Sequence, residues 1–135
     1  MTLKLLTTKP DHLLAEGEHV GYKWVVVHNG MGFRCGYVRV PSSHPWHGKS
    51  YDDIECEVHG GLTYAKADSV TDKLETDAGY WWLGFDCAHA WDLPDPALPC
   101  ESPMCLIDFG DGEIRTQDYV EVECKSLCQQ AKEAE

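Results

Sequence analysis

Tyr22–Val40 has the sequence YKWVVVHNGMGFRCGYVRV, in which two apolar runs flank Asn29-Gly30. The first run, Tyr22–His28, is rich in the β-branched and aromatic residues that are enriched in strands. An Asn-Gly pair after such a run is a strong hairpin signal, because both residues tolerate the positive φ of a tight turn. Phe33–Val40 alternates as a returning strand should. This stretch therefore predicts two antiparallel strands that pair with each other.

Later segments also have strand patterns. Ile54–His59 alternates, Gly60-Gly61 makes a bend or a bulge, and Leu62–Ala65 continues the strand. Gly79–Phe85 (GYWWLGF) is the most aromatic stretch and predicts a central strand. Met104–Phe109 is expected to be an edge strand.

The C-terminal segment has helical periodicity. From Gln117 to Lys132, apolar residues recur every three or four positions, which places them on one face of a helix. We therefore expect an amphipathic helix over residues 116–132, whereas the polar segment Lys66–Asp77 predicts a surface connection or a short helix. Strands followed by a terminal helix predict an α+β fold, with an antiparallel sheet of about five strands and the helix packed on it.

The chain has 135 residues and a formal net charge of -12 at pH 7. We expect residues 1–135 to form a single domain, in which residues 1–20 are a variable N-terminal segment. This acidity opposes direct binding to nucleic acid, because polyphosphates attract clustered lysine and arginine. No stretch approaches the roughly 20 apolar residues that cross a bilayer, so no association with a membrane is expected.

The cysteines favour a reduced environment. Seven are present without a CxxC pair, and an odd number cannot close completely into intramolecular disulfides. A cytoplasmic location is therefore expected, although Cys100 and Cys105 could pair or share a metal across their proline-containing loop. Met1–Thr8 has only a brief apolar patch, too short for the core of a secretory signal. The sequence leaves open whether the chain forms a homo-oligomer.

Candidate metal ligands occur in the segment GFDCAHAWD (Gly84–Asp92). Asp86, His89 and Asp92 are spaced by three residues, so a helical turn would place them near one face. With His59 from the earlier segment, they form a set of imidazole and carboxylate groups that suits zinc, manganese or iron. An open position on such a metal, Zn or Mn above all, would allow activation of water.

The segment HGGLT (His59–Thr63) permits a different interpretation, a site for an anion. Paired glycines let backbone amides approach a phosphate or a carboxylate, His59 can donate a hydrogen bond, and Thr63 adds a hydroxyl. Tryptophans and tyrosines could supply flat walls for a base or a sugar ring. The candidate ligand-binding residues are His59, Gly60, Gly61, Thr63, Tyr64, Trp82, Asp86 and His89, and Trp81 and Trp91 are further candidate wall residues.

Structural roles compete with both interpretations. Asp86 could cap a helical turn by accepting backbone hydrogen bonds, and His89 could be a satisfied polar residue beneath the loops. Cys87 could be a nucleophile, but a neighbouring carboxylate raises the pKa of a thiol rather than lowering it. The long loop after Pro41 contributes His44 and His47, which could be ligands, proton carriers or surface residues.

The segments HGGLTY (His59–Tyr64) and GFDCAH (Gly84–His89), with the run CGYVRVP (Cys35–Pro41), resemble a family of small uncharacterised proteins encoded by bacteriophages and prophages. The resemblance covers about residues 20–130. It supplies no catalytic residues, because that family has no secure activity. It does imply a phage protein acting in the cytoplasm of the host cell, where such small proteins are often accessory or counter-defence factors.

Three hypotheses about function follow from these patterns. The first is a phage-type cytoplasmic binding protein whose polar pocket holds a small anionic ligand, with a sequestered nucleotide signal as one candidate. The second is a metal-dependent hydrolase that uses His59, Asp86, His89 and Asp92. The third is an acidic inhibitor of a host nucleic-acid enzyme. The sequence alone does not decide whether the protein is an enzyme.

Overall fold

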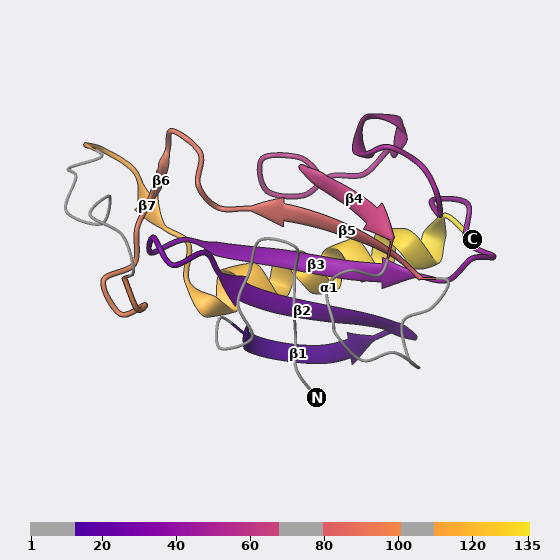
Figure 1. The fold of residues 1–135 in the computed structure, drawn as a ribbon, viewed down its shortest axis with the longest axis horizontal. Helices are drawn as coiled ribbons and strands as arrows, with labels where there is room; N and C mark the ends of the chain where they lie inside the picture. The colour runs from indigo at the N-terminus through magenta and orange to yellow at the C-terminus, as the bar shows by residue number, and fades with distance from the viewer. Residues whose placement is uncertain (1–12, 68–79, 101–109) are drawn as a thin grey trace.

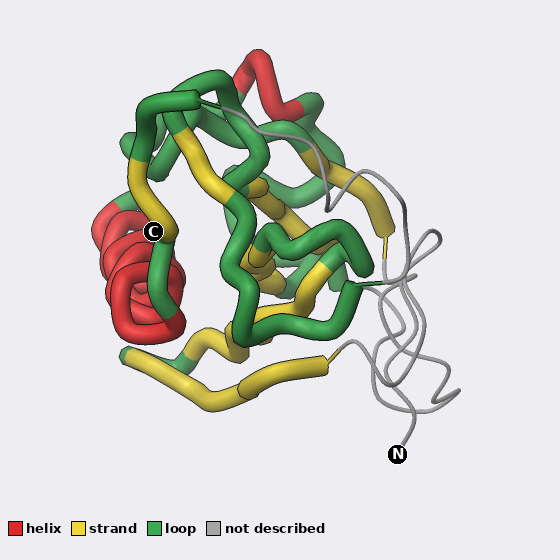
Figure 2. Tube along the Cα trace, turned by 90° about the vertical axis from the view of Figure 1, so that its left-hand side faces the viewer, coloured by secondary structure: helices red, strands yellow, loops and turns green. Residues whose placement is uncertain are grey.

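Five strands form one antiparallel sheet in the order β1-β2-β3-β5-β4 (Figure 1). The computed structural model describes residues 13–67, 80–100 and 110–135. The strands of the sheet are β1 (Leu13–His19), β2 (Tyr22–His28), β3 (Arg34–Val40), β4 (Tyr64–Ala67) and β5 (Trp81–Asp86). The helix α1 (Gln117–Glu133) lies along one face of this sheet (Figure 2). The predicted α+β fold is confirmed.

Smaller elements complete the described part of the fold. A 3-10 turn, η2 (Tyr51–Asp53), interrupts the long loop after β3. The short strands β6 (Asp92–Leu93) and β7 (Glu113–Ile114) pair in parallel. This pair ties the loop after β5 to the segment that leads into α1.

The predicted pairing of β2 with β3 is confirmed. Trp24 lies opposite Val38, and His28 lies opposite Arg34. The connection is longer than a two-residue turn, because the N–H of Asn29 donates to the carbonyl oxygen of Phe33 at 3.0 Å. The side-chain oxygen of Asn29 also accepts the N–H of Met31 at 2.8 Å, an arrangement that satisfies the loop backbone.

The sheet buries apolar side chains on both faces, because alternate residues of each strand point to opposite sides. On the face toward α1 the buried strand residues are Tyr22, Trp24, Val26, Val38, Val40, Leu83 and Phe85. A second cluster on the other face contains Val25, Val27, Cys35, Tyr37 and Trp82. The two clusters account for the near-continuous apolar sequence of β2 and β5.

The predicted helix over residues 116–132 is confirmed. The hydroxyl of Thr116 accepts the N–H of Tyr119 at 3.2 Å and so caps the first turn of α1. A Cβ added to Gly36 in β3 would lie 2.7 Å from the sulfur of Cys124, so glycine allows the helix to approach the sheet closely. The buried residues of the helix are Val120, Cys124, Leu127, Cys128 and Ala131.

The first strand of the sheet was not expected, because residues 1–20 were predicted to be a variable segment. β1 pairs with β2, and Gly17 lies opposite Trp24. A Cβ on Gly17 would lie 2.6 Å from the indole ring of Trp24, so the glycine makes room for that ring. Packing against a neighbouring strand therefore selects a glycine that strand propensity disfavours.

The predicted strand Ile54–His59 is wrong, and β4 begins at Tyr64 rather than at Leu62. The N–H of Glu57 donates to the side-chain oxygen of Gln130 at 2.7 Å, and the amide of Gln130 donates back to the carbonyl oxygen of Glu57 at 2.7 Å. Side chains of α1 thus replace a neighbouring strand as hydrogen-bond partners of this extended segment.

Several sequence predictions concern residues that lie outside the described part of the chain. These are the edge strand Met104–Phe109 and most of the connection Lys66–Asp77. Cys100 is disulfide-bonded, which departs from the reduced state expected for the chain. Among the described residues, the free cysteines are Cys35, Cys56, Cys87, Cys124 and Cys128. Across the described residues, no helix has both the length and the apolar character needed to cross a membrane.

Candidate metal centre

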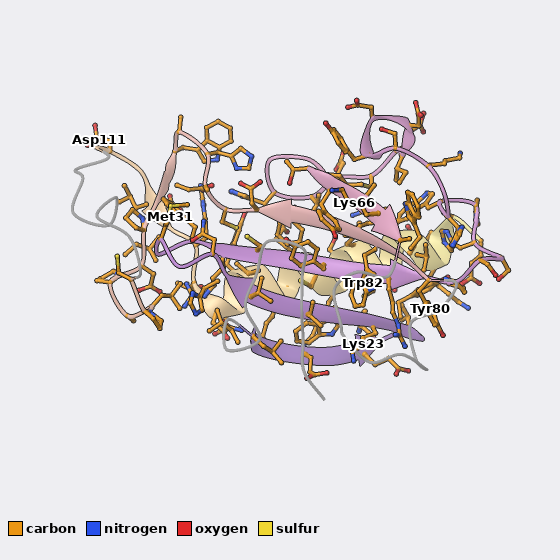
Figure 3. The ribbon with its side chains drawn as sticks, in the orientation of Figure 1. Lys23, Met31, Lys66, Tyr80, Trp82 and Asp111 are labelled. Atoms are coloured by element: carbon orange, nitrogen blue, oxygen red, sulfur yellow. The ribbon has the colours of Figure 1, made fainter. Side chains whose placement is uncertain are left out.

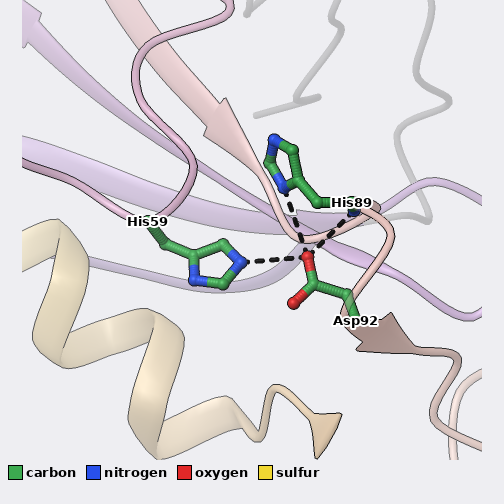
Figure 4. A group of neighbouring side chains, drawn as sticks. All are labelled: His59, His89 and Asp92. Atoms are coloured by element: carbon green, nitrogen blue, oxygen red, sulfur yellow. Dashed lines mark hydrogen bonds and ion pairs between the residues drawn. The ribbon is translucent and has the colours of Figure 1, made fainter. Parts of the chain in front are cut away.

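His59, His89 and Asp92 meet beyond the end of β5 (Figure 4). His59 follows the extended segment that runs along α1, the loop after β5 supplies His89, and Asp92 is the first residue of β6. One nitrogen of each imidazole and one oxygen of Asp92 all lie within 4.8 Å of one another. The two segments singled out in the sequence therefore share one site.

Asp92 is the centre of this group and is almost fully buried. Its Oδ2 accepts hydrogen bonds from Nε2 of His59 at 2.9 Å and from the backbone N–H of His89 at 2.9 Å. Its Oδ1 accepts Nε–H of Arg115 at 2.8 Å. Burial by itself raises the pKa of this carboxyl group, but the hydrogen bonds from Arg115 and His59 outweigh it and lower the pKa to about 2.

Two side chains of α1 hold His59 in place. Its backbone N–H donates to Oε1 of Glu123 at 2.7 Å, and its Nδ1 lies 2.8 Å from the hydroxyl of Tyr119. Burial raises the pKa of Tyr119, so this phenol stays protonated near neutral pH. The imidazole of His59 is therefore buried and bound at both nitrogens, which fixes its orientation.

The imidazole of His89 lies between a glycine and a tryptophan. Its ring stacks on Trp91 with centroids 5.4 Å apart and an interplanar angle of 11°. On the other side, a Cβ added to Gly60 would lie 2.1 Å from Cε1 of His89. Gly60 is therefore needed for this close approach, whereas a Cβ on Gly61 would meet no atom within 4 Å.

The spacing of the three ligand atoms suits a transition-metal ion. Oδ2 of Asp92 lies 2.9 Å from Nε2 of His59 and 3.2 Å from Nδ1 of His89. Zinc with bonds of about 2.0–2.1 Å places tetrahedral ligands roughly 3.3 Å apart. These two distances are within a few tenths of an ångström of that spacing, and all three ligand atoms lie within 4.8 Å of one another. Tyr119 and Arg115 supply the outer hydrogen bonds that metal-binding imidazoles and carboxylates usually have.

Asp86 lies beside this group rather than within it. Its Oδ1 is 3.8 Å from Nδ1 of His89 and accepts the N–H of Ala88 at 3.1 Å. Its Oδ2 accepts the hydroxyl of Thr63 at 3.0 Å. The predicted residues Asp86 and Thr63 are thus near the centre, but their polar groups bind each other.

The aromatic wall predicted from Tyr64 and Trp82 is not formed at this site. Trp82 is completely buried in the cluster on the sheet face opposite α1, and Tyr64 packs edge-on against Tyr37. The aromatic rings that border the centre are Tyr119, which packs edge-on against His59, and Trp91, which is 51% exposed. Strand alternation explains the difference, because Trp82 points away from the helix-facing side of β5.

Three residues contact the site but were not predicted from the sequence, namely Tyr119, Glu123 and Arg115. Tyr119 and Glu123 are four residues apart and therefore lie on the same side of α1, where sequence periodicity grouped them with the apolar stripe. A tyrosine and a glutamate at the border of such a stripe are the signal that could have indicated polar contacts. Arg115 lies just before the helix, where no apolar periodicity could indicate its contact with the site.

Cys87 is a poor candidate nucleophile. Its side chain is buried, and burial raises the pKa of its thiol, with Asp92 adding to the effect. The thiol therefore stays protonated near neutral pH.

Comparison with known proteins adds no assignment. No protein-family model, no curated protein and no solved structure matches this chain. The geometry of His59, His89 and Asp92 is therefore the basis for a proposed function.

Proposed function

We propose that the protein is a metal-dependent hydrolase that binds Zn²⁺ or Mn²⁺ through His59, His89 and Asp92. The observation that carries the proposal is the convergence of two imidazoles on one carboxylate oxygen at 2.9 and 3.2 Å. These three residues would hold the ion, which would supply an acidified water able to attack an ester or amide near neutral pH.

The hydrogen bonds around His59 suit a metal ligand. A ligating nitrogen must present a lone pair, so binding through Nε2 moves the proton of a neutral imidazole to Nδ1. Nδ1 lies 2.8 Å from the hydroxyl of Tyr119, which can either donate or accept a hydrogen bond. Tyr119 can therefore accommodate the change of tautomer by rotating its O–H bond.

Arg115 contributes to the charge at the site. Its guanidinium donates to the Asp92 oxygen that does not face the imidazoles, so Oδ2 is left for the metal. Two neutral imidazoles and one carboxylate leave a divalent ion with a net positive charge, which favours deprotonation of a bound water. The nearby arginine adds to this positive potential.

An anion site built on Gly60-Gly61 has less support than the metal centre. The imidazole of His89 occupies the space over Gly60 that an anion would need. The setting suggested by the sequence resemblance, a phage protein in the host cytoplasm, is compatible with the proposed hydrolase. We propose no particular substrate for this hydrolase.

Metal analysis of the purified protein tests the proposal. We expect about one Zn²⁺ or Mn²⁺ per chain after loading and dialysis, and affinities at least 100-fold weaker for His59→Ala and His89→Ala. His47→Ala removes a histidine outside the centre and should retain the metal. Hydrolysis of p-nitrophenyl phosphate, bis-p-nitrophenyl phosphate and p-nitrophenyl acetate is then measured with and without metal. Equal metal content in all three variants, or no metal-dependent hydrolysis, would contradict the proposal.

A further inference from the structure

A cavity lies at the other end of the sheet from the metal centre. β2 begins there, β3 ends there and β5 begins there, whereas the metal centre lies beyond the end of β5. Figure 3 shows Lys23 and Tyr80 at this end, opposite Met31 and Asp111. The cavity has a volume of about 390 Å³, which is within the range of small-molecule sites.

Positive charge gathers at this cavity although the chain is strongly acidic. Lys23, Arg39 and Lys132 line it, which is three of the eight lysines and arginines in the described part of the chain. Among the described residues the carboxylates in its wall are Glu18 and Glu135, and Glu16 pairs with Lys23 at 3.1 Å. The described lining residues therefore have a net charge of +1, in contrast to the -12 of the whole chain. Such a local excess attracts a small anion more than a cation.

Contacts within the wall hold two of these cations where a ligand can reach them. The guanidinium of Arg39 lies 4.0 Å from the ring centroid of Tyr80, which holds it flat against the wall. Lys132 makes a 3.4 Å ion pair with Glu135, and both partners are about half exposed. Exposed ion pairs of this kind contribute little stability, so a ligand can replace them at low cost.

Backbone strain occurs at the edge of the same cavity. Val20 and Gly21 connect β1 to β2, and Val20 has a φ of 47°. Among the described residues, Val20 is the only residue other than glycine with a positive φ. A β-branched residue is disfavoured there, where asparagine or glycine is usual. Val20 is nevertheless 40% exposed and lines the cavity. Strained residues that persist in a fold cluster at ligand sites.

We propose that this cavity binds a small organic anion, a phosphate or a carboxylate attached to an apolar or planar body. Arg39 and Lys132 receive the anionic group, and Val20 contacts the apolar body. The site is independent of the metal centre and does not depend on hydrolase activity.

Calorimetry with adenosine 5′-monophosphate and benzoate tests this proposal against the uncharged probes adenosine and benzamide. We expect saturable binding of at least one anion and binding of its uncharged counterpart that is at least ten-fold weaker. His59→Ala, which lacks the metal centre, should bind the anion with unchanged affinity. Absence of saturable binding for both anions would overturn the proposal, and so would binding that is lost with His59.

Charge substitutions on one helix provide a matched comparison. Lys132→Gln removes a cation from the cavity wall, and Lys125→Gln makes the same change elsewhere on α1. We expect Lys132→Gln to weaken anion binding about three-fold, Arg39→Gln to weaken it at least ten-fold, and Lys125→Gln to leave it unchanged. Equal weakening by Lys132→Gln and Lys125→Gln would show that bulk charge alone attracts the anion.

Val20→Asn separates the role of the strained turn from folding. Asparagine tolerates the positive φ of this position, so the variant should unfold at a higher temperature than the parent. Loss of the apolar contact should nevertheless weaken anion binding several-fold. A variant that is more stable and binds the anion equally well would show that Val20 has no part in the site.

Discussion

Substitution of Gly60 by alanine should remove metal binding without unfolding the protein. Gly60 and Gly61 both have a positive φ, 69° and 80°, so alanine at either position incurs a similar backbone cost of about 1–2 kcal/mol. Only the new Cβ at position 60 would collide with the imidazole of His89, at 2.1 Å from Cε1 and 2.4 Å from Nε2. Gly61→Ala is therefore a control that carries the strain without the collision.

The size of the effect follows from the displacement of His89. An ordinary contact requires at least 3.4 Å, so the ring must retreat from a Cβ that would lie at 2.1 Å. Metal–ligand distances tolerate changes of only about 0.2 Å. Loss of an outer hydrogen-bond partner already weakens metal binding about 10–100-fold. Displacement of a ligand should weaken it by roughly 100-fold or more.

Competition of each variant with a fluorescent zinc chelator gives the affinities, and thermal unfolding of the metal-free proteins gives the stabilities. We expect both variants to unfold about 3–8 °C below the parent, because 1 kcal/mol lowers the midpoint by roughly 3–4 °C in a domain of this size. Only Gly60→Ala should lose zinc affinity. Equal zinc affinity of Gly60→Ala and Gly61→Ala would refute the placement of His89 in the metal centre.

Three further predictions concern the surroundings of the site. Tyr119→Phe removes the hydroxyl that binds Nδ1 of His59 and should weaken zinc binding about 10–100-fold in the chelator assay, while an unchanged affinity would argue against an outer-shell role. Thr116→Ala removes the cap of α1 and should cost about 1 kcal/mol in denaturant unfolding with zinc affinity retained; lower affinity would mean that the start of the helix shapes the site. In the metal-free protein, Asp92 has a pKa of about 2 against an ordinary 3.8, so its contribution of about 2 kcal/mol is present above pH 3.8 and is lost as the pH falls toward 2. Asp92→Asn should show a flatter loss of stability over that range in acid titration, and an identical pH profile would contradict the charged interactions described for Asp92.

Local sequence patterns predicted the parts of the fold that depend on neighbouring residues. The hairpin over Tyr22–Val40 follows from strand propensity and the turn at Asn29, and α1 follows from its apolar periodicity. β1 did not follow in this way, because Gly17 is explained only by the indole of Trp24 on the next strand. A contact between strands is not visible in the spacing of residues along one of them.

The residues of the candidate metal centre were predicted only in part, because Asp86 was expected among them and lies beside the group. His59, His89 and Asp92 were recognisable as ligand types at the ends of apolar runs. Trp82 was predicted to line the site but points to the other face of the sheet, because a run of consecutive aromatic residues does not indicate which of them points toward the helix. Tyr119 was hidden for a related reason, since its hydroxyl reaches His59 from the border of the apolar helix face.

X-ray absorption at the zinc edge of the zinc-loaded protein tests the central claim most directly. For zinc bound by His59, His89 and Asp92, we expect scattering from two imidazoles and from oxygen ligands at about 2.0–2.1 Å. We also expect that His89→Ala removes one imidazole from this pattern or abolishes loading. A shell of sulfur at about 2.3 Å, which would assign the zinc to cysteines, or a spectrum without imidazole scattering would contradict a centre built from His59, His89 and Asp92.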